Sequence, residues 1–138
     1  MRLSALAVGL LLVPGLASAQ PFTFVSTPAS DALAVVDLST HMVVDTIPLG
    51  GGLPSGCAVG PHGKRLYAVL SQSNALARID MATGAVQMIP VGARPSGVSA
   101  EPSGRRVYVA NTAPDTESVV DAERGNVIAT IPLRGAPP

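Results

Sequence analysis

The stretch that decides the fold is residues 97–133, GVSAEPSGRRVYVANTAPDTESVVDAERGNVIATIPL. Residues 56–91 repeat it as GCAVGPHGKRLYAVLSQSNALARIDMATGAVQMIPV, and a third, shorter copy occupies residues 24–49. Three sets of anchor residues keep step between the copies: Phe24, Tyr67 and Tyr108; Asp37, Asp80 and Asp121; Pro48, Pro90 and Pro132. The anchors recur every 41 to 43 residues. That period is typical of a four-stranded blade of a β-propeller.

Each full copy contains four short β-prone runs that are separated by turn residues. In the third copy the runs are residues 98–101, 106–111, 118–121 and 127–133. Pro, Gly, Ser and Asp lie between them, and these residues favour tight turns. The connections are too short for a crossover helix, so we expect the strands to form antiparallel meanders. The runs are apolar on both faces, which indicates sheets that are buried on both sides.

We therefore predict an all-β fold of β-propeller blades, with about 2.75 four-stranded antiparallel blades in an incomplete propeller. Blade 1 should cover about 22–53, blade 2 about 54–94 and blade 3 about 95–138, within a mature region 20–138. The first copy lacks its opening strand, and propellers typically have four to eight blades. Two explanations stay open. The chain is a fragment of a larger propeller with further C-terminal blades, or two or three chains complete a ring.

The first nineteen residues have the pattern of a secretory signal peptide. Arg2 supplies the positive charge, residues 3–12 are apolar, and Ala17-Ser18-Ala19 form a cleavage site of small residues. The apolar run is too short to span a membrane, which takes about 20 residues. We therefore expect a secreted or periplasmic protein with no membrane span after removal of residues 1–19.

Composition argues against several classes of partner. Without Arg2, eight basic residues face nine acidic ones, a net charge near −1, which gives no electrostatic reason to bind nucleic acid. Two Phe, two Tyr and no Trp leave few side chains for stacking on bases. Cys57 is the single cysteine, so no internal disulfide can form. We interpret Cys57 as a small buried apolar residue, with a reactive thiol or an intermolecular bridge as the alternative.

The polar residues that recur between copies are interpreted as turn residues. Asp37, Asp80 and Asp121 each end a strand, where the carboxylate can accept hydrogen bonds from turn amides. His41 aligns with two glycines and is expected to have a positive φ. His62 lies in another turn. The acidic group Asp115, Glu117, Asp121 and Glu123 lacks the spacing of a calcium loop. We predict no catalytic residue, no metal and no cofactor.

The third copy also resembles a known repeat family. Tyr108-Val109-Ala110-Asn111, the following Val-Val-Asp and then residues 129–133 are similar to the YVTN-type β-propeller repeat. The second copy matches through Tyr67, Asp80, Thr83-Gly84 and residues 89–92, although its turn reads Pro-His-Gly where the family has Pro-Asp-Gly. The resemblance implies an exported, YVTN/lactonase-like propeller and covers the chain after the signal peptide.

The resemblance also implies where a ligand would bind. The innermost strand of each blade should be the one that begins Pro-Ser-Gly, at Pro54 and Pro95. Ligands would lie at loops near the central funnel, so Arg94 and Asn111 are the ligand-binding candidates.

The leading functional hypothesis is an exported, non-catalytic β-propeller segment that serves as a binding or interaction module for an unknown protein or small molecule. The alternative is the scaffold part of a periplasmic propeller enzyme. Such an enzyme would be a lactonase-type hydrolase or a haem/quinone-linked oxidoreductase, with its catalytic residues in the missing blades. In either case both ends of the blade array should be open, which predicts association into a homo-oligomer or with missing C-terminal blades.

Overall fold

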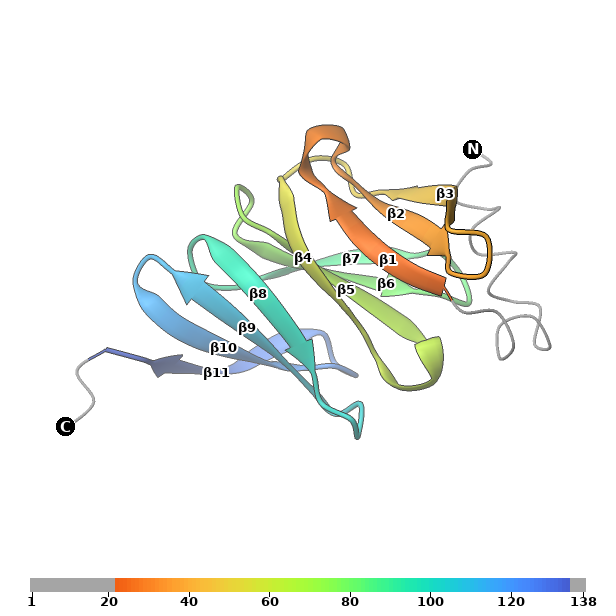
Figure 1. Ribbon diagram of the computed structural model, residues 1–138. Coiled ribbons are helices and arrows are strands. Elements are labelled where there is room, and N and C mark those ends of the chain that lie inside the picture. Colours follow the sequence, from red (N-terminus) through yellow and green to blue (C-terminus); the bar gives the residue numbers. More distant parts are fainter. Residues whose placement is uncertain (1–21, 135–138) are drawn as a thin grey trace.

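The computed structural model describes residues 22–134, which form eleven β-strands and two single turns of 3₁₀-helix (Figure 1). The first three strands are β1 (Phe22–Thr27), β2 (Ala32–Asp37) and β3 (Met42–Pro48). The next four are β4 (Pro54–Val59), β5 (Arg65–Leu70), β6 (Ala75–Asp80) and β7 (Val86–Pro90). The last four are β8 (Pro95–Ala100), β9 (Arg106–Thr112), β10 (Asp115–Asp121) and β11 (Asn126–Pro132). The 3₁₀ turns, Pro28–Ser30 and Pro61–Gly63, follow β1 and β4.

The strands form three separate antiparallel sheets, in the orders β1-β2-β3, β4-β5-β6-β7 and β8-β9-β10-β11. We name these sheets blade 1, blade 2 and blade 3. Spatial order follows chain order, as short connections require. The predicted fold class is confirmed: the chain is all-β, its sheets are propeller blades of three, four and four strands, and within 22–134 they do not close into a ring. The predicted signal peptide, residues 1–19, lies outside the described residues. None of the described helical turns is long and apolar enough to cross a membrane.

The hairpin turns are held by the aspartates that end a strand. Oδ1 of Asp80 accepts hydrogen bonds from the amides of Ala82 and Thr83, at 2.9 and 3.2 Å. Asp121 binds the amides of Glu123 and Arg124 in the same way, at 3.0 and 2.8 Å. The interpretation of these residues as turn residues is therefore correct.

Blade 1 builds the same hairpin turn. Oδ1 of Asp37 accepts hydrogen bonds from the amide and the hydroxyl of Ser39, at 2.8 and 2.6 Å. His41 closes this turn with a φ of +59°, where blades 2 and 3 have Gly84 and Gly125. The positive φ expected for His41 is confirmed.

The apolar core lies between the blades, in two layers. Seam 1, between blades 1 and 2, contains Leu33, Val35, Ile47, Leu49, Leu66, Ala68, Leu70, Ala77, Ile79 and Met81, with Phe22, Phe24 and Cys57 packed against them. Seam 2, between blades 2 and 3, contains Tyr67, Val69, Leu76, Ile89, Val107, Val109, Val120 and Ala122, with Val91, Val98, Ala100 and Val127 beside them. The cores are made mostly of small aliphatic side chains.

Strand β5 shows why its sequence is apolar throughout. Successive side chains of a strand point to opposite faces. Leu66 and Ala68 therefore enter seam 1, while Tyr67 and Val69 enter seam 2. The expectation of sheets buried on both faces is met in blade 2.

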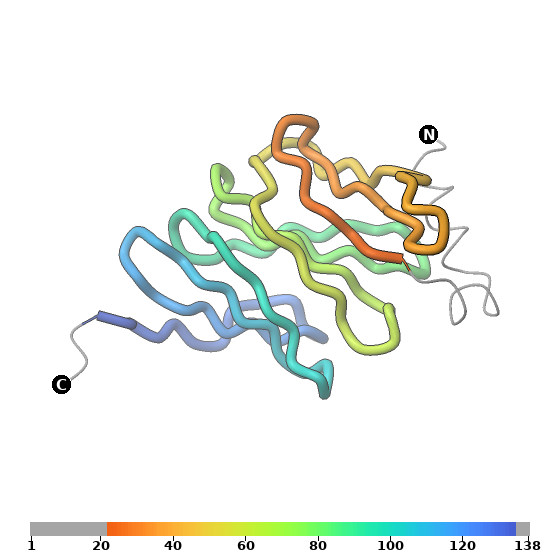
Figure 2. Tube along the Cα trace, viewed as in Figure 1, coloured from red at the N-terminus to blue at the C-terminus, as the bar shows by residue number. Residues whose placement is uncertain are grey.

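The opening strands of the blades lie next to one another. Strand β8 packs beside β4, and β1 packs beside β4 from the other side (Figure 2). By the repeat, β1 corresponds to β5 and β9, so within residues 22–134 blade 1 has no counterpart of β4 and β8. Strand β1 pairs only with β2 in the described sheet. Its other edge has no strand partner there.

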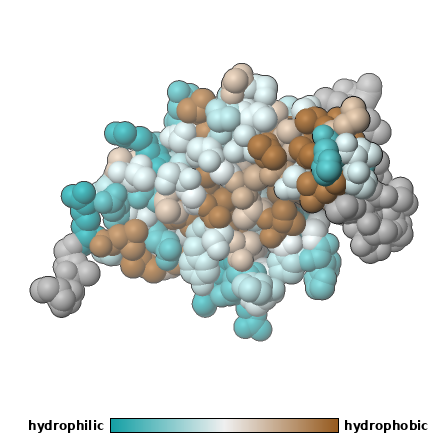
Figure 3. Space-filling model, viewed as in Figure 1, coloured by the Kyte–Doolittle hydropathy of each residue, from teal (hydrophilic) through white to brown (hydrophobic). Residues whose placement is uncertain are grey.

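Blade 3 has one face that no described blade covers. Ile47, Ile89 and Ile131 occupy the same place in the three blades, on the face toward the following blade. Ile47 and Ile89 are 6% and 1% exposed, because blades 2 and 3 cover them, whereas Ile131 is 43% exposed. Apolar residues are visible along the C-terminal strand in the space-filling view (Figure 3).

Candidate functional site

The predicted ligand-binding residue Arg94 lies in the connection between β7 and β8. Its side chain is exposed, and its φ is +50°. The backbone of Arg94 is used to hold the connection: its amide donates to Oδ1 of Asn74 at 2.9 Å, and its carbonyl accepts the amide and hydroxyl of Thr112 at 3.1 and 3.0 Å. A ligand contact by its guanidinium stays a prediction.

Asn111, the second predicted candidate, is buried near the end of β9, with 2% of its surface exposed. Its Nδ2 donates to the hydroxyls of Thr116 and Ser118, at 3.1 and 3.0 Å. Gly92 lies so close that a Cβ there would be 2.5 Å from Nδ2. The side chain therefore joins blade 3 to the connection from blade 2. No described residue satisfies its Oδ1.

The acidic group and the cysteine are engaged locally. Oδ2 of Asp115 pairs with Nε of Arg134 at 2.7 Å, and Oε2 of Glu123 pairs with Nη1 of Arg65 at 3.2 Å. Within residues 22–134, no group of three His, Cys, Asp or Glu side chains could hold a metal ion. Cys57 is half-buried in β4, with its Sγ 3.2 Å from the carbonyl oxygen of Phe24, and burial raises the pKa of its thiol.

A cavity lies between blades 2 and 3, at the other end of the blades from Arg94 and Asn111. It has a volume of about 580 Å³, within the range of small-molecule sites. We name it the inter-blade pocket. Its lining comes from β5 and from the turns β4–β5, β6–β7, β8–β9 and β10–β11: Gly60, Pro61, His62, Gly63, Lys64, Arg65, Tyr67, Asp80, Met81, Ala82, Ser103, Gly104 and Glu123.

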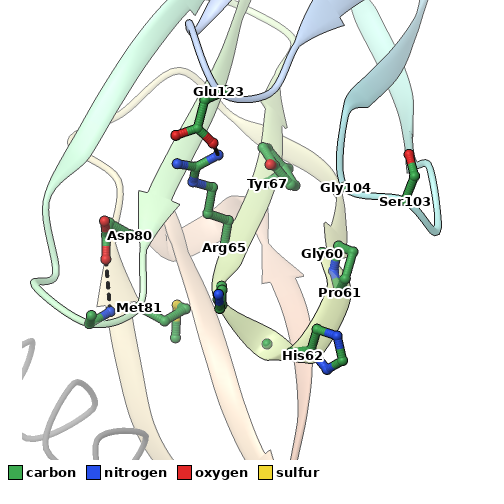
Figure 4. A pocket seen from close by; sticks show the side chains of 13 residues that line it. Gly60, Pro61, His62, Arg65, Tyr67, Asp80, Met81, Ser103, Gly104 and Glu123 are labelled. Carbon is green, nitrogen blue, oxygen red and sulfur yellow. Dashed lines mark hydrogen bonds and ion pairs between the residues drawn. The ribbon is translucent and has the colours of Figure 1, made fainter.

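Arg65, which lines this pocket, and Arg78, which lies beside it, meet the same turn of blade 3. Nη1 of Arg65 and Nη1 of Arg78 both donate to the carbonyl oxygen of Ala122, at 2.8 and 2.6 Å. Arg78 also donates to the carbonyl oxygen of Glu123 at 3.0 Å and to Oε1 of Gln87. Figure 4 shows Arg65 reaching from its strand to Glu123, with Tyr67 beside it. The two guanidinium groups thus share one carbonyl oxygen, and Arg65 also pairs with the carboxylate of Glu123.

The surroundings keep Arg65 charged and Tyr67 neutral. Burial by itself lowers the pKa of Arg65, but the hydrogen bond and charge of Glu123 outweigh it, and the pKa is above its ordinary value. Burial raises the pKa of Tyr67, against the opposing effect of Arg65 and Arg78. The pocket therefore offers a cation and a hydroxyl donor at neutral pH.

The sequence by itself does not predict this pocket. Lys64 is exposed, whereas its neighbour Arg65 is partly buried and binds blade 3. The signal that could have found the site is strand register. Tyr67 and Arg78 are direct cross-strand partners, as are Arg65 and Asp80, so all four side chains share one face of blade 2.

Comparison with known proteins identifies the fold only. No protein-family model matches the chain, and no curated protein sequence matches it. Hydrazine synthase of Kuenenia stuttgartiensis is similar in structure, with a TM-score of 0.73 and 26% identity over 79% of this chain and 32% of that chain. A protein of unknown function from Desulfotomaculum acetoxidans gives a TM-score of 0.71 and 13% identity over 83% of this chain and 37% of that chain. The chain thus spans about a third of the length of both proteins.

Proposed function

We propose that this chain is an exported, non-catalytic segment of a YVTN-type β-propeller and acts as an interaction module through its uncovered blade faces. The repeat anchors support the family, and the pattern of residues 1–19 supports export to the periplasm or the medium. The partner is a further blade of the same kind, supplied by C-terminal blades or by a second copy of the chain. Bound in this way, the chain contributes three blades to a larger propeller.

The observation that carries this proposal is the exposure of Ile131. Its equivalents in blades 1 and 2 are buried by the next blade, so the same position in blade 3 is built to be covered. Tyr108 follows the same pattern, because it is half-buried where its equivalent, Tyr67, is 2% exposed. Burial of apolar surface stabilises by about 25 cal/mol per Å². An uncovered blade face of several hundred Å² therefore favours association by many kcal/mol.

Sedimentation velocity of the chain starting at Gln20 tests the proposal. We expect the wild type to associate, and Ile131→Glu to shift the distribution toward monomer because a carboxylate cannot be buried in an apolar face. Met88→Glu is the matched control, since Met88 lies on the opposite face of β7 from Ile89 and is 45% exposed. A monomeric wild type, or equal effects of the two variants, would contradict the role of the face.

Export has a separate test. We expect the full chain, produced in a bacterium with a periplasm, to be recovered outside the cytoplasm with Gln20 as its N-terminus. Mass spectrometry of the intact protein measures this directly. Recovery in the cytoplasm with Met1 retained would contradict export.

A second candidate function is the scaffold part of a periplasmic propeller enzyme, either a lactonase-type hydrolase or a haem/quinone-linked oxidoreductase. The similarity to about a third of a protein named hydrazine synthase favours it. The coding sequence after Pro138 discriminates between the two functions. Further repeats with inward-facing His or Glu residues would favour the enzyme, and a stop codon with soluble protein would favour the module.

A further inference from the structure

We propose that the inter-blade pocket binds a small organic monocarboxylate, with Arg65 as the residue that holds the carboxylate. This site goes beyond the proposed role of the uncovered blade faces. It lies between two blades that are both described, and it does not depend on a partner chain or on further blades.

The repeat provides an internal control for the chemistry of the pocket. The residues of blade 1 that correspond to Arg65, Tyr67 and Arg78 are Phe22, Phe24 and Val35. Val35 belongs to the apolar core of seam 1 and the two phenylalanines pack against it, so the fold closes a seam with apolar side chains at these three positions. Two guanidinium groups at seam 2 are therefore not required for packing. Both guanidinium groups already bind the carbonyl oxygen of Ala122, so they bring charge and hydrogen-bond donors to positions where packing does not need them.

The charged side chains in and beside the pocket have a net charge of one positive unit. Lys64 and Arg65 supply two positive charges to the lining, and Arg78 supplies a third beside it, where it binds the carbonyl oxygen of Glu123; Asp80 and Glu123 supply two negative charges. The Asp80 carboxylate already accepts the two turn amides, and the Glu123 side chain is 83% exposed. A single negative charge on a ligand balances this set, whereas a phosphate dianion would leave it net negative. The charge balance therefore favours a monoanion.

Donors are available to hold a carboxylate. Both hydrogen bonds of Arg65 to blade 3 use Nη1, and Tyr67 is its other neighbour, so the guanidinium has more N–H groups than these contacts need. A guanidinium binds a carboxylate through two parallel N–H groups, which fixes the ligand's orientation. The Tyr67 hydroxyl stays protonated because burial raises its pKa, and it lines the same cavity.

The rest of the lining suits an apolar group attached to that carboxylate. Pro61, Met81 and Ala82 provide apolar surface on the β4–β5 and β6–β7 turns. A cavity of about 580 Å³ is larger than a lone ion requires. A carboxylate with a short aliphatic or aromatic tail fits both the charge and the walls, as in typical small-ligand sites with few polar groups on an apolar lining.

Calorimetric titration of the full chain with sodium benzoate tests the site, with sodium acetate and inorganic phosphate as separate arms at constant ionic strength. We expect benzoate to bind more tightly than acetate, and phosphate to bind least. Absence of binding by all three would overturn the site. Tighter binding of phosphate than of benzoate would overturn its assignment to monocarboxylates.

Variants locate the site. Arg65→Phe introduces the residue that blade 1 uses at this position, so the fold should tolerate it, and we expect benzoate affinity to fall about tenfold or more. Arg106→Phe makes the same change at the equivalent position of blade 3, outside the pocket, and should leave affinity unchanged. Equal effects of the two variants, or no effect of Arg65→Phe, would overturn the proposal. If circular dichroism shows that Arg65→Phe does not fold, Arg65→Lys is the second variant. It keeps the positive charge but cannot bind a carboxylate in the bidentate geometry, so we again expect a loss of benzoate affinity.

Discussion

Seam 1 and seam 2 join consecutive blades of the same repeat, but they do so with different chemistry. At seam 1 the blade-1 strands contribute Phe22, Phe24 and Val35, and these three side chains make apolar contacts. At seam 2 the same three positions are Arg65, Tyr67 and Arg78, and both arginines bind the carbonyl oxygen of Ala122 across the seam. The repeat therefore determines where the blades meet, but the side chains at the edge of each seam differ between blades.

The two seams also differ at the end that lies away from the inter-blade pocket, where seam 1 is again apolar and seam 2 polar. Leu70 and Ala77 lie in the core of seam 1, and their equivalents at seam 2 are Asn111 and Ser118, which hydrogen-bond to each other. Each seam still buries an apolar centre, with Leu66 in the first and Val107 in the second. Apolar burial at the centre is thus common to both, and the polar groups at the two rims of seam 2 are where function can differ between blades.

The strongest test of this comparison replaces a central residue of seam 1. Leu66→Ala removes a fully buried side chain, and we expect it to lower the free energy of unfolding by about 2–5 kcal/mol. Arg78→Val introduces the residue that blade 1 has at the equivalent position. It should change the free energy of unfolding by no more than about 1 kcal/mol, because partly exposed charged contacts contribute little net stability. Urea denaturation at one protein concentration measures both. A cost of Arg78→Val equal to that of Leu66→Ala would mean that seam 2 depends on its polar contacts.

The second test concerns the close contact at the end of seam 2. A Cβ added at Gly92 would lie 2.5 Å from Nδ2 and 2.6 Å from Cγ of Asn111, so Gly92→Ala should destabilise by about 1–3 kcal/mol. Gly97→Ala is the control, because its nearest neighbour, Cβ of Ala110, is 4.0 Å away. We expect the control to change the urea midpoint little. Similar effects of the two changes would show that Asn111 moves aside without cost.

The strand pattern was predictable from the repeat, with errors that have physical reasons. The run 106–111 corresponds to β9 (Arg106–Thr112), but the strand predicted at 98 begins at Pro95, which pairs with Asn111. Proline is tolerated as the first residue of a strand, so it did not mark a loop here. Asp115, expected in a turn, already pairs with Thr112, because the hairpin loop has only two residues, 113–114.

The inter-blade pocket was not predictable in the same way. Its walls come from β5 and from four turns in two blades, and the contact between lining residues of the two blades joins Arg65 to Glu123, 58 residues away. The strand register places Arg65, Tyr67 and Arg78 on one face, but only the packing of blade 3 against that face makes a cavity. The candidates named from the family resemblance, Arg94 and Asn111, lie at the other end of the blades and remain predictions.

A third test exchanges polarity at seam 1. Asp45 is buried on β3 opposite Val35, and no described residue satisfies its Oδ2. Because a buried carboxylate oxygen without a partner is costly, Asp45→Val should raise the free energy of unfolding by about 1 kcal/mol. Asp31→Val, at a partly exposed turn position, is not expected to stabilise. Loss of stability in Asp45→Val would indicate that the carboxylate has a role at this seam.

The smallest expected effect compares the hairpin turns of blades 1 and 3 at acid pH. The side-chain hydrogen bond from Ser39 lowers the pKa of Asp37, and the backbone amide of Arg124 lowers that of Asp121. Because each pKa is lower in the folded chain than in the unfolded one, each carboxylate stabilises the fold above about pH 4. That contribution is lost as the pH falls through the lowered pKa.

Both carboxylates are exposed, so the effect on the unfolding midpoint should be modest. We expect Asp37→Asn and Asp121→Asn each to flatten the fall in the urea midpoint between about pH 5 and pH 3. Ser39→Ala should flatten the fall in the urea midpoint by its effect on Asp37 alone. Asp121 is held by backbone amides and has no serine partner in its turn. Ser99→Ala, an exposed serine on β8, is the matched control. A pH profile of Ser39→Ala identical to that of the control would mean that the hydroxyl contributes nothing and that backbone amides alone set the titration of these turns.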